Sequence, residues 1–204
     1  MTNQITTIIF DYGGVLLEWN PRNLYRRFFP NQPEAMEQFL TEVKFVDWNL
    51  QQDKGRPFED AIDSLSAEFP HHTHLIRAYY EYWEESISGV IPGSIEILKQ
   101  LKVRQYPLYG LSNWSAETFS RARHSYEFFN LFDDMVISGE VKMVKPEPEI
   151  FHLALQQFGK SAGECVYIDD SLANTEQARK LGFVAIHFQS PEQLKSDLQR
   201  LGVM

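Results

Sequence analysis

Three features are scarce or missing in this sequence of 204 residues: cysteine, long apolar runs and an excess of positive charge. Cys165 is the only cysteine, so no disulfide can form within the chain, and its apolar neighbours predict a small core residue rather than a nucleophile. No apolar run is long enough to span a bilayer, and the first residues show no basic, signal-type segment. We therefore expect a cytoplasmic protein that is not bound to a membrane.

The net charge of −9 argues against a nucleic-acid partner, because binding to a phosphate backbone requires clustered positive charge. It does not exclude a small phosphorylated substrate, since a bound metal ion can supply positive charge locally. Apolar residues make up 43% of the chain and aromatic residues 14%, which is typical of a globular protein. A chain of this length can bury a core, either as one domain that carries a large insertion or as two small domains.

The stretch of residues 6–16 organises the rest of the sequence. Residues 6–10 are mostly apolar and β-branched, which predicts a short buried strand that ends at Asp11. Gly13 and Gly14 follow, and two glycines allow the backbone to turn sharply and approach a ligand closely. Ligands of an open α/β sheet collect at the carboxyl ends of its strands, so Asp11 is either a reactive group or the cap of a turn.

Residues 18–88 show helical spacing without the alternation of a strand, and Asn20 followed by Pro21 predicts the first helix start. After residue 91, helices alternate with four predicted strands near residues 107–111, 135–138, 166–168 and 184–186. This alternation implies a parallel sheet with right-handed crossovers. We therefore predict an α/β fold: a Rossmann-like core of residues 1–17 and 89–204, with an α-helical bundle of residues 18–88 inserted after the first strand.

Polar residues follow three of these strands, and a loop contributes one more: Asp11, Ser112-Asn113, Asp169-Asp170 and Lys145. Each has an ordinary structural explanation as a turn, a cap or a solvated loop residue, but their meeting at one edge of a sheet favours a functional site. Carboxylates without histidine or cysteine form an oxygen site that suits Mg²⁺. A serine hydroxyl and a lysine ammonium bind phosphate, and an aspartate can attack phosphorus.

In order and spacing, four segments resemble the four motifs of the haloacid dehalogenase superfamily: Asp11-x-Gly13-Gly14-Val15, Ser112-Asn113, Lys145-Pro146 and Asp169-Asp170-x-x-x-Asn174. The resemblance covers the whole chain, and the insertion of residues 18–88 is similar to the helical C1 cap of that family. The resemblance implies Asp11 as the nucleophile. It also implies Ser112, Asn113 and Lys145 as phosphate-binding residues, with Lys145 steadying Asp11.

The same resemblance implies a Mg²⁺ site. The cation would be held by the side chain of Asp11, the backbone carbonyl of Gly13 and the side chain of Asp170. Asp169 would be an additional or supporting acid, and Asn174 would orient the loop that carries both aspartates.

Gly13 departs from the pattern of the family's phosphatases, which usually carry a second aspartate there as general acid and base. Tyr12 and Glu18 are near in sequence, but nothing in the sequence points either into the site. Two branches lack the second aspartate: the metal-independent 2-haloacid dehalogenases, and a group similar to α-D-glucose-1-phosphate phosphatases. The adjacent Asp169 and Asp170 favour the second branch, because a site without metal has little use for clustered carboxylates.

The sequence therefore predicts a Mg²⁺-dependent phosphatase that acts on a small phosphorylated metabolite, for example a sugar phosphate such as glucose 1-phosphate. Without the usual acid, we expect a preference for activated leaving groups such as an anomeric oxygen. Two alternatives stay open: a metal-independent 2-haloacid dehalogenase, and a catalytically inactive binding protein that uses the same fold as a scaffold.

Overall fold

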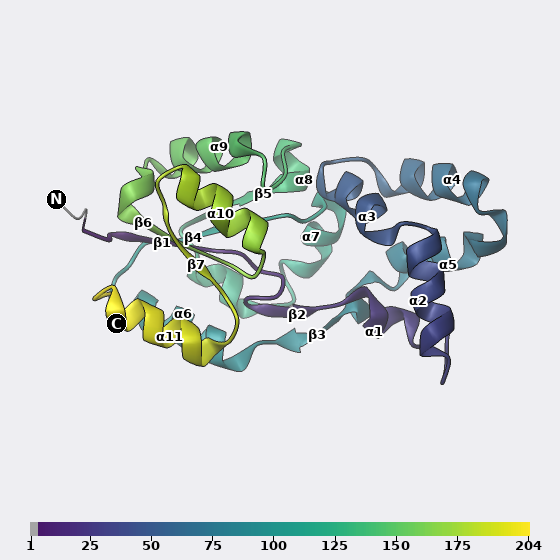
Figure 1. Cartoon of the computed structure of the whole chain (residues 1–204), viewed down its shortest axis with the longest axis horizontal. Helices are drawn as coiled ribbons and strands as arrows, with labels where there is room; N and C mark the ends of the chain where they lie inside the picture. Colours follow the sequence, from purple (N-terminus) through teal and green to yellow (C-terminus); the bar gives the residue numbers. More distant parts are fainter. Residues whose placement is uncertain (1–3) are drawn as a thin grey trace.

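A five-stranded parallel sheet forms the centre of the computed structural model, which describes residues 4–204 (Figure 1). The strands, in spatial order, are β5 (Asp134–Ile137), β4 (Leu108–Ser112), β1 (Thr7–Phe10), β6 (Cys165–Asp169) and β7 (Val184–His187). β1 lies in the middle, where Ile8 is opposite Leu108 on one side and Val166 on the other. The predicted α/β fold is confirmed, and the central position of β1 puts Asp11 at the middle of the carboxyl edge.

Helices cover both faces of the sheet, because successive residues of each strand point to opposite sides. Ile9 packs with the apolar residues of α9 (Pro148–Phe158) and α10 (Leu172–Lys180). Ile8 and Phe10 belong to the cluster on the other face, which includes α6 (Pro92–Val103) and α11 (Pro191–Arg200). The remaining elements of this part are α7 (Ala116–Ala122), α8 (Ser138–Val141), η3 (Glu127–Leu131) and η4 (Ala162–Glu164).

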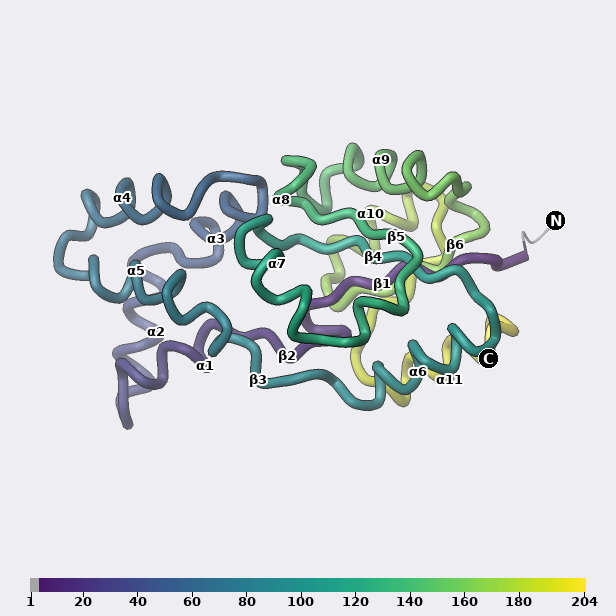
Figure 2. The backbone as a smooth tube through the Cα atoms, turned by 180° about the vertical axis from the view of Figure 1, so that it is seen from behind, coloured from purple at the N-terminus to yellow at the C-terminus, as the bar shows by residue number. Residues whose placement is uncertain are grey.

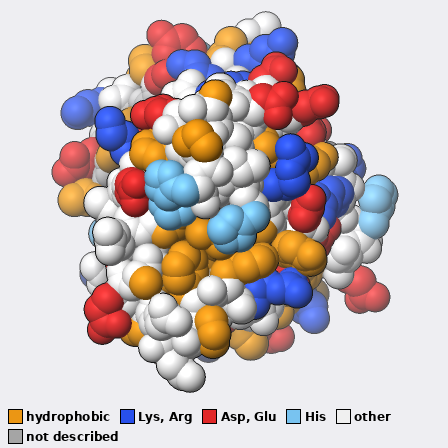
Figure 3. Space-filling model, turned by 90° about the vertical axis from the view of Figure 1, so that its right-hand side faces the viewer, with side chains coloured by type: hydrophobic (Ala, Val, Ile, Leu, Met, Phe, Trp, Pro, Cys, Tyr) orange, Lys and Arg blue, Asp and Glu red, His pale blue; other side chains and the backbone are white. Residues whose placement is uncertain are grey.

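The segment between β1 and α6 forms a separate helical lobe beyond the carboxyl edge of the sheet (Figure 2). Its elements are α1 (Pro21–Tyr25), α2 (Pro33–Glu42), α3 (Phe45–Asp53), α4 (Phe58–Glu68), η1 (Pro70–His72), α5 (Thr73–Glu81) and η2 (Trp83–Ser86). Aromatic rings make its core, and Tyr25, Phe45 and Trp48 all lie within contact distance of Tyr79. Figure 3 views the molecule from the end that this lobe forms, where hydrophobic side chains lie among charged ones.

The expectation that residues 18–88 contain helices only was wrong at both ends. β2 (Leu17–Trp19) and β3 (Ile87–Val90) pair in an antiparallel ribbon that connects the lobe to the sheet. These strands have three and four residues and are partly exposed, so neither shows an alternation long enough to recognise in the sequence.

Two helix starts show why the sequence folds as it does next to the carboxyl edge. The side chain of Ser115 caps α7 by accepting a hydrogen bond from the backbone N–H of Thr118. Ser171 caps α10 in the same way, with Asn174 as the donor, so this helix begins directly after Asp169 and Asp170. Among residues 4–204, none of the helices combines the length and apolar character needed to cross a membrane.

Candidate active site

The structure brings the predicted strand-end residues together at the carboxyl edge of the sheet. Asp11, Ser112, Lys145 and Asp169 are buried there, although all four are polar or charged. Such burial is costly unless the groups satisfy one another, so their mutual contacts determine what the site can do.

Three donors converge on a single oxygen of Asp11. The hydroxyl of Ser112 donates to Oδ1 at 2.6 Å, the backbone N–H of Tyr12 donates at 2.7 Å, and Nζ of Lys145 lies 3.0 Å away. Within residues 4–204, no donor contacts the second carboxylate oxygen, Oδ2. Asp11 is therefore fixed in position while one oxygen keeps its lone pairs for a ligand.

Lys145 lies between two carboxylates. Its Nζ donates to Oδ2 of Asp169 at 2.7 Å and to the backbone carbonyl of Leu111 at 2.9 Å. The amide of Asn113 holds the backbone of Lys145 on both sides, donating to its carbonyl at 3.0 Å and accepting from its N–H at 2.8 Å. Asn113 lines the pocket described below, but its amide groups are used to position the lysine.

Asp169 is surrounded by donors, whereas Asp170 is not. Asp169 accepts hydrogen bonds from Lys145, from the hydroxyl of Tyr167, from the backbone N–H of Ser171 at 2.8 Å and from the amide of Asn174. The side chain of Asp170 is exposed. Asp169 and Asn174 therefore form the support of the site, while the carboxylate of Asp170 is accessible to a ligand.

The electrostatics of this cluster favour a bound cation. Burial raises the pKa of Asp11 to about 7, and the charges of Asp169 and Asp170 add to this, although Lys145 and Ser112 oppose it. Burial and the charge of Asp169 also raise the pKa of Asp170. Asp11, Asp169 and Asp170 each place one oxygen within 4.8 Å of the others. Oxygen ligands with too little positive charge among them fit a hard divalent cation.

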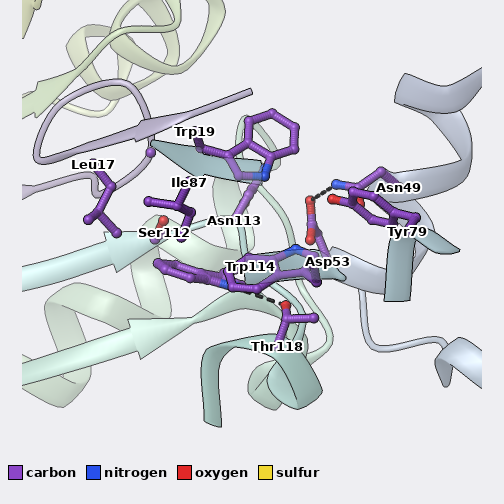
Figure 4. Close-up of a pocket in the computed structure, with 12 residues that line it drawn as sticks. Leu17, Trp19, Asn49, Asp53, Tyr79, Ile87, Ser112, Asn113, Trp114 and Thr118 are labelled. Carbon is purple, nitrogen blue, oxygen red and sulfur yellow. Dashed lines mark hydrogen bonds between the residues drawn. The ribbon is translucent and has the colours of Figure 1, made fainter. Parts of the chain in front are cut away.

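A pocket with a cavity volume of about 80 Å³ lies between this edge and the helical lobe (Figure 4). Large apolar side chains from both parts line it: Leu17, Trp19, Tyr79, Trp83, Ile87 and Trp114. Its polar lining includes Ser112 and Asn113 from the edge and Asn49 and Asp53 from α3. This volume corresponds to several water molecules at about 10–15 Å³ each. The pocket therefore suits a small ligand group, and a larger ligand group requires the lobe to move away.

Sequence reasoning missed the contribution of the helical lobe. Tyr79 and Trp83 are buried in the lobe, and both also line the pocket. Asp53 ends a helix that the sequence did not reveal, since α3 has a weak apolar face and follows Lys44, which has a left-handed conformation. No local pattern distinguishes Asp53 from the other acidic residues of the lobe.

An aspartate directly after the central strand of a parallel α/β sheet, with a buried lysine beside it, forms the centre of this candidate site. A sequence model of the haloacid dehalogenase-like hydrolases matches residues 5–182, and the chain belongs to this family of enzymes.

Two curated relatives are phosphatases by name. The chain is 26% identical to a sesquiterpene phosphatase from Aspergillus oryzae over 92% of this chain and 91% of that protein. It is 26% identical to a phosphorylated carbohydrates phosphatase from Thermotoga maritima over 88% of this chain and 83% of that protein. Among solved structures, a haloacid dehalogenase family enzyme from Bacteroides thetaiotaomicron, in complex with magnesium and inorganic phosphate, superimposes with a TM-score of 0.71. That alignment has 26% identity and covers 91% of this chain and 95% of the other.

Proposed function

We propose that this protein is a Mg²⁺-dependent phosphatase that hydrolyses a small phosphorylated metabolite through an aspartyl-phosphate on Asp11. The observation that carries the proposal is the position of Asp11, which is held through Oδ1 by Ser112 and Lys145 while Oδ2 stays open. A carboxylate oxygen fixed in this way is suited to attack phosphorus. The phosphatase relatives support the same reaction class.

Ser112 and Lys145 have the roles of phosphate donors in this proposal. Both touch Asp11, so a phosphoryl group placed against Asp11 lies within reach of the hydroxyl and the ammonium. The neighbouring charges of Asp11 and Asp169 raise the pKa of Lys145, although burial alone would lower it. The lysine is therefore cationic and balances charge that builds up on the phosphoryl oxygens in the transition state.

The proposed ligands of Mg²⁺ are the side chain of Asp11, the backbone carbonyl of Gly13 and the side chain of Asp170. Asp169 is a less suitable direct ligand, because Lys145, Tyr167, Ser171 and Asn174 already donate to it. The related enzyme, whose structure contains magnesium and inorganic phosphate, supports magnesium as the cation. When bound, Mg²⁺ neutralises phosphate charge that the carboxylates would otherwise repel.

We further propose that residues 18–88 act as the cap that closes over the phosphate site, with residues 1–17 and 89–204 as the catalytic core. The pocket between the two parts supports this division, since it takes side chains from both. A closed cap excludes bulk water from the phosphoryl group and selects the leaving group by its shape.

The pocket lining favours an apolar or aromatic leaving group. Leu17, Trp19, Trp83 and Trp114 line it, and among residues 4–204 no lysine, arginine or histidine does. A hexose needs several hydrogen-bond partners, whereas a small alkyl or aryl group is stabilised mainly by burial against such side chains. The second candidate is a sugar phosphate such as glucose 1-phosphate. The similarity to the carbohydrate phosphatase supports it.

The test is a panel of phosphate monoesters that contains prenyl, aryl and sugar phosphates, assayed with Mg²⁺ and with excess EDTA. We expect release of inorganic phosphate with Mg²⁺ and its loss with EDTA. Halide release from 2-haloacids in EDTA would instead establish the dehalogenase alternative. Ligand binding without turnover of any ester would support the inactive binding protein.

A further inference from the structure

The first motif of the catalytic core provides no acidic side chain that could protonate the departing oxygen in the proposed phosphatase reaction. Gly13 has no side chain, and among residues 4–204, apart from Gly13 itself and its two neighbours in the chain, nothing lies within 4 Å of the place where its β-carbon would be. The ring of Tyr12 packs in the core, with centroids 5.0 Å from Phe129 and 5.3 Å from Phe132. Glu18 is exposed and accepts a hydrogen bond from Ser88 at 2.9 Å. Neither near neighbour therefore supplies the proton.

The helical lobe places one carboxyl group in the pocket. Asp53 is the last residue of α3, and its side chain lines the same pocket as Ser112 and Asn113 (Figure 4). The amide of Asn49 donates to Oδ2 of Asp53 at 3.0 Å. Asp53 is thus oriented by a neighbouring side chain of its own helix.

Contacts between the lobe and the core hold the end of α3 in place. The hydroxyl of Ser138 donates to the backbone carbonyl of Asp53 at 2.5 Å. Lys54 forms an ion pair with Glu147 at 2.6 Å, and the backbone N–H of Phe58 donates to Glu117 at 2.8 Å. The position of Asp53 over the site is therefore set by the core itself.

We propose that Asp53 is the general acid and base of this enzyme, supplied by the helical lobe in place of a residue at position 13. The inference rests on the proposed phosphatase function. Burial raises the pKa of Asp53 to about 7, and Asp11 adds to this, while the Ser115 N–H and Lys145 oppose it. Within residues 4–204, the other titratable side chain that lines the pocket is Tyr79, whose pKa burial raises well above its usual value, so it stays neutral. A carboxyl group in this range can give and regain a proton near neutral pH.

In the first step, Oδ2 of Asp11 forms a bond to phosphorus while the bond from phosphorus to the ester oxygen breaks. The bonding electron pair and the proton of Asp53 both go to that oxygen, which leaves as an alcohol. In the second step, a water oxygen attacks the aspartyl-phosphate and its proton passes to the carboxylate of Asp53. The Asp11–phosphorus bond breaks, which releases inorganic phosphate and restores both aspartates.

The experiment compares kcat/KM of wild type and Asp53→Asn for p-nitrophenyl phosphate and for n-hexyl phosphate, with Mg²⁺. Nitrophenolate leaves without a proton, whereas an alkoxide needs one, so we expect hexyl phosphate to lose about 10²–10⁴-fold and nitrophenyl phosphate less than about 10-fold. Asp47→Asn is the matched control, because Asp47 is an exposed acid on the same helix. It should leave both values at the wild-type level.

Two further readouts separate chemistry from folding. Since the proposed base also serves the second step, Asp53→Asn should release a burst of about one nitrophenolate per enzyme before slow turnover. The wild-type kcat/KM for hexyl phosphate should fall as pH rises through about 7, and this limb should disappear in the variant. Equal losses for both esters, or no loss for either, would overturn the proposed role of Asp53 but not the phosphatase proposal. A wild type that hydrolyses no ester would overturn the phosphatase proposal itself.

Discussion

The side chain of Asp170 occupies the space that a β-carbon at Gly14 would need. Gly14 has a φ of +73°, and a β-carbon built on it would overlap Oδ2 of Asp170. Gly14, in the first motif, thus leaves room for the side chain of Asp170, in the last motif, which directly follows β6.

This contact predicts the effect of Gly14→Ala. The substitution should displace the Asp170 carboxylate and raise the Mg²⁺ concentration for half-maximal activity about 10-fold or more. It should also cost about 1–3 kcal/mol of stability, because alanine disfavours a positive φ. A Mg²⁺ titration of phosphatase activity measures the first effect. Gly159→Ala, at a φ of +64° with open space around it, is the control for backbone strain alone. An unchanged Mg²⁺ dependence would show that Asp170 does not hold the cation.

Asp11→Asn should lower kcat by about 10³-fold or more, because the amide lacks the negatively charged oxygen with which the carboxylate attacks phosphorus. The amide oxygen can still accept hydrogen bonds from Ser112 and from the backbone N–H of Tyr12, so the fold should persist. Circular dichroism with steady-state kinetics checks both points. A variant that retains a tenth of the activity would contradict a covalent role for Asp11.

Asp169 and Asp170 should differ in what their loss affects. Asp170→Ala should weaken activation by Mg²⁺ more than Asp169→Ala does, because Asp170 is the accessible carboxylate. Asp169→Ala should instead lower the free energy of unfolding by about 3 kcal/mol, since it removes a buried partner of Lys145. Metal titration and chemical denaturation of both variants decide this. A larger shift in Mg²⁺ affinity for Asp169→Ala would reverse the assignment.

Gly13→Asp should restore alkyl phosphate hydrolysis in the Asp53→Asn background. The space at position 13 is open within residues 4–204, so a carboxyl group there can reach the departing oxygen from the core side. We expect kcat/KM for hexyl phosphate to rise about 10-fold or more over the single Asp53→Asn variant. Gly13→Asn in the same background controls for the added volume, and an equal gain with asparagine would exclude proton transfer as the cause.

Gly110→Ala should destabilise the core by about 1–3 kcal/mol, because its β-carbon would overlap the hydroxyl of Tyr12. That hydroxyl is buried and, within the described residues, has no hydrogen-bond partner. Tyr12→Phe alone should therefore cost little, and it should recover most of the stability lost in Gly110→Ala. A double-mutant cycle by thermal unfolding measures this coupling, and simple additivity would contradict the overlap.

The sheet and the polar residues at its carboxyl edge could be predicted from the sequence, because both depend on short local patterns. Each strand of the sheet is an apolar run that stops at a polar residue, and parallel strands necessarily present those stops at one edge. Lys145 comes from a loop, and the side chain of Asn113 holds its backbone next to these strand ends.

The pocket above that edge could not be predicted in the same way. β2 and β3 pair across about 70 residues, and Asp53 meets Ser138 only because α3 packs against the core. Such contacts depend on how the lobe packs against the core. The spacing of residues within either part does not predict that packing. The exposed position of Asp170 beside the fully bonded Asp169 likewise depends on the start of α10.

The hydrogen bond from Ser138 to the carbonyl of Asp53 joins the lobe to the core at the residue that we propose as the acid. If the lobe lifts away, the proton donor leaves together with it. A substrate whose leaving group props the lobe open can then still bind its phosphate, yet it receives no proton and is not cleaved. Such a compound would behave as a competitive inhibitor, so the enzyme would discriminate by the completeness of closure rather than by affinity.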